Sequence, residues 1–204
     1  MLQKLSILIY LVLSVQTFCD ATDYADMKSQ SDSCPSKPTQ CGGVTYGKTE
    51  RTLCLIKPDG VQRNLIGDII KRFEIKGLKL IGLKFMWPED KVLRSQYRGS
   101  ADEPFFEEMI GYVKRGPIVA MAWEGFNAVD MGRNLLVGNN RLNPAPGTIR
   151  GDYCSNDLIH RFTVAHASDS VGEAERELAL YFTKNELITW NYSQETWIYQ
   201  RMNG

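Results

Sequence analysis

Four short apolar segments, separated by stretches with helical spacing, constrain the fold of this chain most strongly. The apolar segments cover residues 53–56, 78–86, 118–123 and 159–165. Runs of this length next to turn residues are typical of buried strands. Apolar residues elsewhere recur at helical intervals, which predicts helices near 65–76, 88–97, 102–113, 126–136 and 171–182. Strands that alternate with helices indicate a single α/β domain over residues 50–204, with helices packed on a sheet in two layers.

Composition excludes several classes of protein. The 24 Lys and Arg residues balance 24 Asp and Glu residues, so the formal net charge is zero. A chain-wide basic field for holding nucleic acid is therefore excluded. Five Cys in 204 residues are too few for a fold held mainly by disulfides. No apolar run reaches the roughly 18 residues of a membrane-spanning helix, so we expect no membrane span.

Residues 1–19 predict a secretory signal peptide. Lys4 precedes an apolar stretch from Leu5 to Val15, which is followed by polar residues. Cleavage after Cys19 or after Ala21 fits this pattern. An N-terminal strand or an uncleaved anchor is the alternative, but the apolar run is short and unrelated to the domain that follows. The sequence therefore predicts a secreted protein.

Residues 20–49 are expected to form a flexible polar tail, because they have no periodicity and few large apolar side chains. Cys34 and Cys41 lie in this tail. In an oxidising compartment they are candidates for a small disulfide loop, and the alternative is two exposed thiols. Asn191 begins the one glycosylation sequon, Asn191-Tyr192-Ser193, and is a candidate site for a glycan.

The chain has two histidines, and His166 is the better candidate for chemistry. It lies where the last predicted strand meets a helix that begins with a capping box, Ser170 and Glu173. Strand ends and helix N-termini are where α/β folds place sites. His160 lies inside the predicted strand and receives no role. The chain has no Gly-x-Ser-x-Gly elbow and no Gly-x-x-x-x-Gly-Lys-Ser/Thr loop.

Four further residues could form a site around His166. Glu177 follows it by eleven residues, so its carboxylate could reach one ring nitrogen, although a solvated helix Glu is the simpler interpretation. Lys57, Arg133 and Arg150 come from widely separated segments. Each alone is most simply a surface charge, but together with a histidine they would suit phosphate groups.

Several longer blocks resemble the nucleoside diphosphate kinases, in the order in which that family has them. They are Glu50-Arg51-Thr52-Leu53-Cys54-Leu55-Ile56-Lys57-Pro58-Asp59-Gly60-Val61-Gln62-Arg63, Pro104-Phe105-Phe106, Gly116-Pro117-Ile118-Val119-Ala120-Met121, Pro146-Gly147-Thr148-Ile149-Arg150-Gly151-Asp152 and His166-Ala167-Ser168-Asp169-Ser170-Val171. The resemblance covers residues 50 to about 200.

This resemblance implies a ferredoxin-like fold, an antiparallel four-stranded sheet in βαββαβ order with added helices. It also implies transfer of the terminal phosphate of a nucleoside triphosphate, such as ATP, to a nucleoside diphosphate, with Mg²⁺ and a ping-pong cycle. The magnesium ion would be held mainly by the nucleotide phosphates.

The resemblance also implies a role for each site residue. His166 would be the phosphohistidine nucleophile. Lys57, Arg133 and Arg150 would hold the phosphates and the sugar, and Phe105 would stack on the base. Tyr97, Ser168 and Glu177 would support and orient the site.

Three departures from the family pattern stand out. Phe162 and Thr163 occupy the positions of an Arg-Asn pair, and the interval from Cys154 to His166 is about three residues longer. The loop 137–146 lacks a phosphate-binding Thr. Because that loop packs between subunits in the family's assemblies, the change also bears on the homo-oligomer, a hexamer in animal members, that the resemblance implies. A secreted, catalytically impaired nucleotide-binding or interaction protein on the same fold is therefore the alternative to an active kinase.

Overall fold

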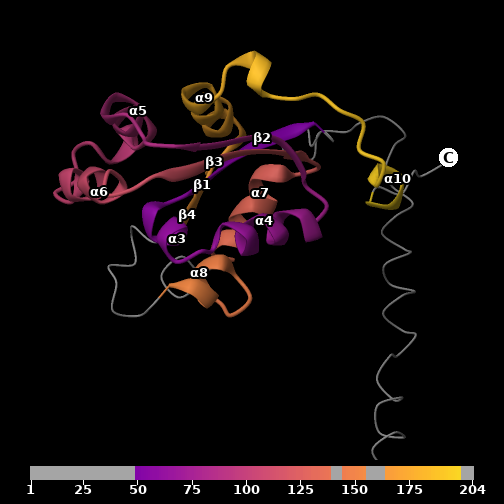
Figure 1. Cartoon of the computed structure of the whole chain (residues 1–204), viewed down its shortest axis with the longest axis horizontal. Coiled ribbons are helices and arrows are strands. Elements are labelled where there is room, and N and C mark those ends of the chain that lie inside the picture. The colour runs from indigo at the N-terminus through magenta and orange to yellow at the C-terminus, as the bar shows by residue number, and fades with distance from the viewer. Residues whose placement is uncertain (1–48, 139–143, 155–163, 199–204) are drawn as a thin grey trace, which may run out of the picture. The chain divides into compact units, whose positions relative to one another are not determined.

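The computed structural model describes residues 49–138, 144–154 and 164–198. Its four strands are β1 (Glu50–Ile56), β2 (Lys79–Met86), β3 (Ile118–Gly125) and β4 (Ala165–Ala167). They form one sheet in the order β2-β3-β1-β4, and every neighbouring pair is antiparallel (Figure 1). This arrangement confirms the ferredoxin-like fold that the resemblance implied.

Helices cover both faces of this sheet. Their bounds are α3 (Pro58–Gln62), α4 (Ile66–Ile75), α5 (Asp90–Gln96), α6 (Phe106–Val113), α7 (Ala128–Leu136), α8 (Ile149–Tyr153), α9 (Val171–Tyr181) and α10 (Glu195–Ile198), with 3₁₀ turns at Arg98–Ser100 and Lys184–Glu186. In Figure 1, α5, α6 and α9 lie on one side of the sheet, and α4, α7 and α8 lie on the other.

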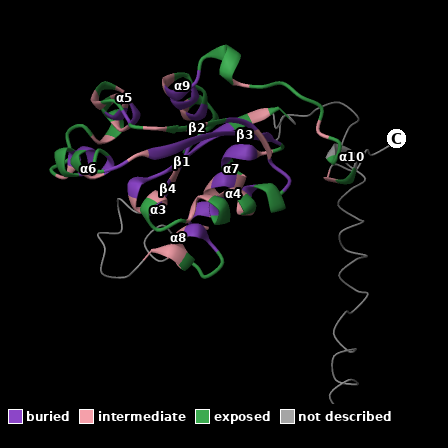
Figure 2. Cartoon of the chain, viewed as in Figure 1, coloured by how far each residue is buried: buried purple, intermediate pink, exposed green. Residues whose placement is uncertain are grey.

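Strand alternation explains why both faces are covered. Leu53 and Leu55 of β1 belong to the core beneath α5, α6 and α9, whereas Cys54 and Ile56 belong to the core that contains residues of α4, α7 and α8. β3 alternates in the same way, and all eight of its residues are buried (Figure 2). The expected two-layer arrangement was therefore wrong, because a central strand whose residues are all buried needs a covering layer on each of its faces.

The fourth strand differs from its predicted position. Residues 159–163 lie outside the described part of the chain, but the strand begins at Ala165 and includes His166 rather than ending before it. Val164 is not part of the strand, and its φ angle is +55°. This left-handed conformation is uncommon for a β-branched residue. At Val164 and Ala165 the apolar run predicted burial correctly, but it carried no signal for this turn.

The helices also differ from prediction at three places. The helix expected from residue 102 begins at Phe106, because residues 102–105 form turns. Residues 57–60, whose Pro, Asp and Gly predict a turn at the end of the first strand, lead into α3, which begins at Pro58. The stretch 137–152, which its Gly, Asn and Pro residues predict to be irregular, contains the start of α8. Both helices have only five residues, which is too short for a hydrophobic period to mark them.

Val164 is fixed by contacts with the turn that follows β1. Its backbone N–H donates to both carboxylate oxygens of Asp59, at 3.2 and 3.0 Å, and its carbonyl accepts the Lys57 N–H at 2.8 Å. Gly60 makes this approach possible. A β-carbon at Gly60 would lie 2.8 Å from Ile56 Cγ2 and 3.0 Å from the Val164 carbonyl oxygen.

We predict that Gly60→Ala destabilises the fold by about 1–3 kcal/mol, because the added methyl group overpacks this contact. Urea denaturation provides the measurement. Gly67→Ala is the matched control, since nothing lies within 4 Å of a β-carbon there and Gly67 is inside α4. The control should gain about 0.5–1 kcal/mol from helix propensity. Equal effects of the two substitutions would contradict the prediction.

Candidate active site

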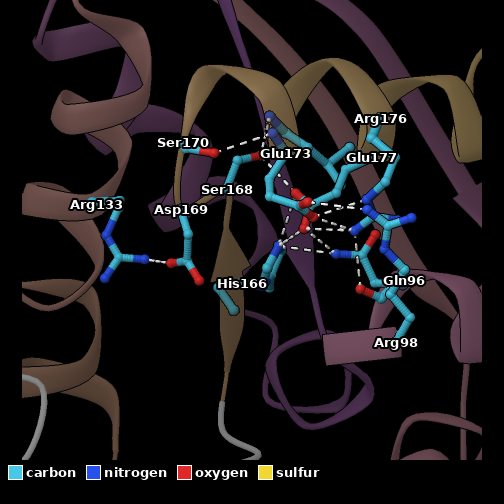
Figure 3. Close-up of polar contacts among 12 residues, drawn as sticks. Gln96, Arg98, Arg133, His166, Ser168, Asp169, Ser170, Glu173, Arg176 and Glu177 are labelled. Carbon is cyan, nitrogen blue, oxygen red and sulfur yellow. Dashed lines mark hydrogen bonds and ion pairs between the residues drawn. The ribbon is translucent and has the colours of Figure 1, made fainter. Parts of the chain in front are cut away.

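His166 is the central residue of β4 and is paired with Leu55 of β1. Side chains of paired residues lie on the same face of a sheet, and Leu55 belongs to the core beneath α5, α6 and α9. The imidazole therefore lies on the α5 and α9 side of an edge strand. In Figure 3 it stands between an Arg133–Asp169 pair and a group of polar side chains around Glu177.

Glu177 of α9 is a buried carboxylate, 4% exposed, with three close hydrogen-bond partners. His166 Nε2 lies 3.0 Å from its Oε1 and 3.1 Å from its Oε2. Ser168 Oγ donates to Oε2 at 2.6 Å, and Gln96 Nε2 donates to Oε1 at 2.6 Å. Burial raises the pKa of the Glu177 carboxyl, but the hydrogen bonds and the charge of His166 outweigh it and hold this pKa below its ordinary value.

This arrangement fixes which nitrogen of His166 is available for reaction. An ionised carboxylate accepts hydrogen bonds only, so the proton of a neutral imidazole belongs on Nε2. Nδ1 then keeps its lone pair and can act as a nucleophile. Ser168 is itself fixed, because its Oγ accepts the Leu53 N–H of β1 at 3.2 Å.

A cavity of about 120 Å³ lies beside the imidazole and contains two cations. It is lined by Arg133, Leu136, Val137, Arg150, His166, Ala167 and Asp169. Arg133 of α7 forms an ion pair with Asp169. A larger cavity of about 410 Å³ lies between α9 and the start of β1, but its lining includes none of the predicted site residues. The smaller cavity is thus the better candidate site, since it brings a histidine next to two arginines, a combination that suits phosphate chemistry.

Local structure explains the position of Arg150. Thr148 caps α8, because its Oγ1 accepts the Gly151 N–H at 3.0 Å. Arg72 of α4 then anchors the same segment by donating to the Gly147 carbonyl at 2.8 Å and pairing with Asp152 at 2.5 Å. Arg150 Nη2 approaches the Ala165 carbonyl of β4 at 3.4 Å.

Lys57 is buried between β1 and α3 and is only 3% exposed. Its ammonium group lies 5.6 Å from the centre of the Tyr97 ring. Burial, reinforced by the charge of Arg150, lowers the pKa of Lys57 to about 7, although Asp59 and Cys154 oppose this. An anion bound nearby would favour the charged form again. Lys57 therefore suits a ligand that brings negative charge into the site.

The remaining predicted residues lie at different distances from this centre. Tyr97 follows α5, and its ring meets the His166 ring edge-on at 6.0 Å. Phe105 caps α6, packs against the core and is not among the residues that line the 120 Å³ cavity. Asn191 is exposed. Cys34, Cys41, Phe162 and Thr163 lie outside the described residues.

Two residues of the site were not identified from the sequence. Gln96 is the last residue of a short helix and carries no motif, so its contact with Glu177 depends on how α5 packs on α9. Asp169 stands in the quoted His166 block, but its pairing with Arg133 joins β4 to α7. The spacing of Ser170 and Glu173 did predict the α9 cap, because Ser170 Oγ accepts the Glu173 N–H at 3.2 Å.

Comparisons with known proteins agree on one family. The family model described as nucleoside diphosphate kinase matches residues 50–187. The chain is 46% identical over 151 residues to the nucleoside diphosphate kinase of Drosophila yakuba, and the match covers 74% of this chain and 99% of that protein. It is 48% identical over 151 residues to human nucleoside diphosphate kinase A, and that match covers 74% of this chain and 97% of the human protein. It is also similar to the structure of a halophilic nucleoside diphosphate kinase from Halobacterium salinarum in complex with CDP, with a TM-score of 0.69, 44% identity and coverage of 74% of this chain and 99% of that one.

We predict that Lys57→Met stabilises the fold by about 1–3 kcal/mol at pH 7, because it removes a buried cation at similar volume. The folded lysine loses its proton above about pH 7, whereas the unfolded one keeps it to about 10.5. The gain should therefore be greatest below pH 7 and shrink as the pH rises towards 10.5.

Urea denaturation at several pH values measures this difference. Lys71→Met, at an exposed position of α4, is the control and should stay within about 0.5 kcal/mol of the original protein. A gain for Lys57→Met that does not depend on pH would contradict the explanation.

Proposed function

The chain belongs to the nucleoside diphosphate kinase family, and from this premise we propose that His166 is the side chain that carries the phosphoryl group. The protein is a phosphotransferase that moves the terminal phosphate of a nucleoside triphosphate to a nucleoside diphosphate. One observation carries the assignment of His166. Its Nε2 contacts the Glu177 carboxylate at 3.0 Å, and the residue also lines the cavity that contains Arg133 and Arg150.

The reaction then has two half-cycles. His166 Nδ1 attacks the terminal phosphorus, a nitrogen–phosphorus bond forms, and the bond to the bridging oxygen breaks. The nucleoside diphosphate leaves with that electron pair. A second nucleoside diphosphate then attacks the phosphohistidine with a terminal phosphate oxygen, and His166 is regenerated. Throughout, Nε2 keeps its proton and donates it to Glu177 as a hydrogen bond.

Arg133, Arg150 and Lys57 are proposed to hold the phosphates. Guanidinium groups bind phosphate oxygens through two parallel hydrogen bonds, and a lysine supplies a compact charge. Arg133 would exchange its partner Asp169 for the ligand, since the two line the same cavity. Phe105 is proposed to stack on the base of the nucleotide. Tyr97, whose ring lies beside that of His166, is proposed to support the site. The CDP in the Halobacterium salinarum complex supports a nucleoside diphosphate as ligand here.

We propose that Mg²⁺ enters with the nucleotide. Among the residues that the structure describes, no group of three or more His, Cys, Asp or Glu side chains could hold a metal ion. An ion whose ligands are mainly phosphate oxygens does not need such a group of side chains. When bound, magnesium would neutralise charge on the transferred group, in addition to the charge that the three cations supply.

A homo-oligomer is proposed from the exposed edge of the sheet. β2 is an edge strand, and its Leu83 and Phe85 are 52% and 66% exposed. Trp87, directly after the strand, is also 66% exposed. Exposed apolar residues on an edge strand favour association, which natural proteins otherwise prevent with charges or bulges. The loop 137–146 lies partly outside the described residues, so the subunit number is left open.

We also propose that the protein is secreted after removal of residues 1–19, with the tail 20–49 joined to the kinase domain. No helix in the described ranges has the length and apolar character needed to cross a bilayer. Asn191 is exposed, as a glycan acceptor must be. The proposed bridge between Cys34 and Cys41 would suit the oxidising route of export.

We predict that the purified protein, incubated with γ-labelled ATP and Mg²⁺, acquires an acid-labile, base-stable phosphate. His166→Ala should remove the label, because the nucleophilic nitrogen is lost. Glu177→Ala should slow labelling by about ten- to a hundredfold, since it removes a charge-assisted hydrogen bond to the ring. His160→Ala is the matched control and should label at the original rate. Labelling that survives in His166→Ala would refute the assignment.

We predict that secretory cells expressing the full chain release protein that begins at Asp20 or Thr22. N-terminal sequencing tests the cleavage. Mapping of non-reduced peptides should show Cys34 joined to Cys41, and glycosidase treatment should lower the mass unless Asn191 is changed to Gln. Retention in the cell with residues 1–19 intact would contradict secretion.

A further inference from the structure

Gln96 is a buried amide that contacts both members of the His166–Glu177 pair. It is the last residue of α5 and is only 4% exposed. Its Nε2 lies 2.6 Å from Glu177 Oε1 and 3.1 Å from His166 Nε2 (Figure 3). The motifs and spacings of the sequence assign it no role, yet its contact with the carboxylate is as short as that of Ser168.

The contact with Glu177 determines the orientation of the Gln96 amide. An amide oxygen at this position would face a carboxylate oxygen at 2.6 Å, and both groups are acceptors. The amide nitrogen must therefore face Glu177 and donate a hydrogen bond. His166 Nε2 and Gln96 Nε2 then both donate towards Oε1, so two donors restrain the position of this one oxygen.

This orientation has a cost elsewhere in the same side chain. The Gln96 Oε1 atom is buried, and no hydrogen-bond partner for it is found among the described residues. A buried acceptor without a partner is unfavourable, because it has lost its hydrogen bonds to water. The amide is thus held in this orientation by the carboxylate, although the orientation leaves its oxygen unsatisfied. Such unfavourable local arrangements in native proteins are concentrated at functional sites.

The polar and titratable groups that face Glu177 come from several elements. His166 of β4 and Gln96 of α5 donate directly, and Arg176, the preceding residue of α9, has Nη2 at 3.8 Å from Oε1. Burial, with the charge of Glu177 as one contribution, raises the pKa values of Tyr97 and Tyr181. These two phenols are therefore neutral near pH 7. The hydrogen bonds from His166, Ser168 and Gln96 are therefore the closest support for the ionised carboxylate.

We propose that Gln96 is a positioning residue for phosphoryl transfer. Its amide N–H holds Glu177 ionised and aligned on His166 Nε2, so that the imidazole presents Nδ1 to the phosphate. This inference rests on the proposed role of His166. Gln96 does not touch the reacting phosphorus, and it is not among the residues that line the cavity with Arg133 and Arg150.

The chemistry of the intermediate explains why this support matters. When the Nδ1–phosphorus bond forms while Nε2 keeps its proton, the imidazole ring becomes positively charged. An ionised Glu177 at 3.0 Å stabilises that charge, and a protonated one does not. A group that keeps Glu177 ionised therefore lowers the barrier without contributing to nucleotide binding, so its loss should reduce kcat and leave the nucleotide Kd unchanged.

The test compares Gln96→Met, which keeps the volume and removes the hydrogen bond, with Gln96→Glu. Rapid-quench labelling with saturating γ-labelled ATP measures the rate of phosphohistidine formation from pH 5 to 9. Gln96→Met should lower this rate by about tenfold at pH 7. The acid limb of its profile should move to higher pH, because the Glu177 pKa rises when a donor is lost. ADP affinity should change by less than about twofold.

Gln96→Glu places two carboxyl groups where they must share a proton, so its acid limb should move further than that of Gln96→Met. Because it is nearly isosteric, it keeps the test valid even if Gln96→Met does not fold. Lys91→Met, at an exposed position of the same helix, should match the original protein.

A Gln96→Met or Gln96→Glu protein that labels at the original rate with an unchanged pH profile overturns the inference. An equal loss of ADP affinity and labelling rate also overturns it, since that result indicates a binding residue. If the original protein itself does not label while its ADP binding persists, the proposed function of His166 fails instead, so the two failures are distinguishable.

Discussion

The candidate active site depends on one buried carboxylate. Glu177 accepts hydrogen bonds from His166, Ser168 and Gln96, which lie on β4, on the segment that follows it and on α5. A buried carboxylate is costly unless it is satisfied in this way. Because the three donors satisfy it, Glu177 can remain ionised and direct the proton of His166 to Nε2. The nitrogen that keeps its lone pair, Nδ1, is thus determined by a residue eleven positions along the chain.

The backbone before His166 brings the two halves of the site together. β4 has only three residues and lies at the edge of the sheet, between a layer that supplies Glu177 and Gln96 and a layer that supplies Arg133 and Arg150. Val164 holds the chain in a left-handed turn at the start of this strand, fixed by Asp59 and the Lys57 N–H. Strained backbone of this kind persists where surrounding contacts over-determine it. An edge strand between two helical layers is therefore what lets one imidazole contact an acid and face a cation-lined cavity.

Several features of the site oppose stability and favour phosphate chemistry. Lys57 is buried with its pKa lowered to about 7, and the Gln96 oxygen is buried without a partner among the described residues. Arg133 and Asp169 pair beside the imidazole, so in the proposed function a polyphosphate would displace a carboxylate from an arginine. A nucleotide brings the negative charge that these groups lack. Groups that lower the stability of the free protein would thus gain favourable partners when a ligand binds. This is the usual exchange between stability and function.

Sequence alone determined the features that depend on local pattern. The apolar runs predicted strands β1, β2 and β3 within a few residues, the helical spacings predicted α4, α7 and α9, and the long blocks identified the family and its ferredoxin-like sheet. The same blocks contain His166, Lys57 and Arg150, and the resemblance to the family added Arg133. Only the tertiary structure decided the rest. The helices on both faces, the turn at Val164, the Arg133–Asp169 pair and the role inferred for Gln96 all depend on contacts between residues far apart in the chain. Periodicity reports which side of a segment is buried but not which segment covers it, so no local pattern could place Gln96 against Glu177.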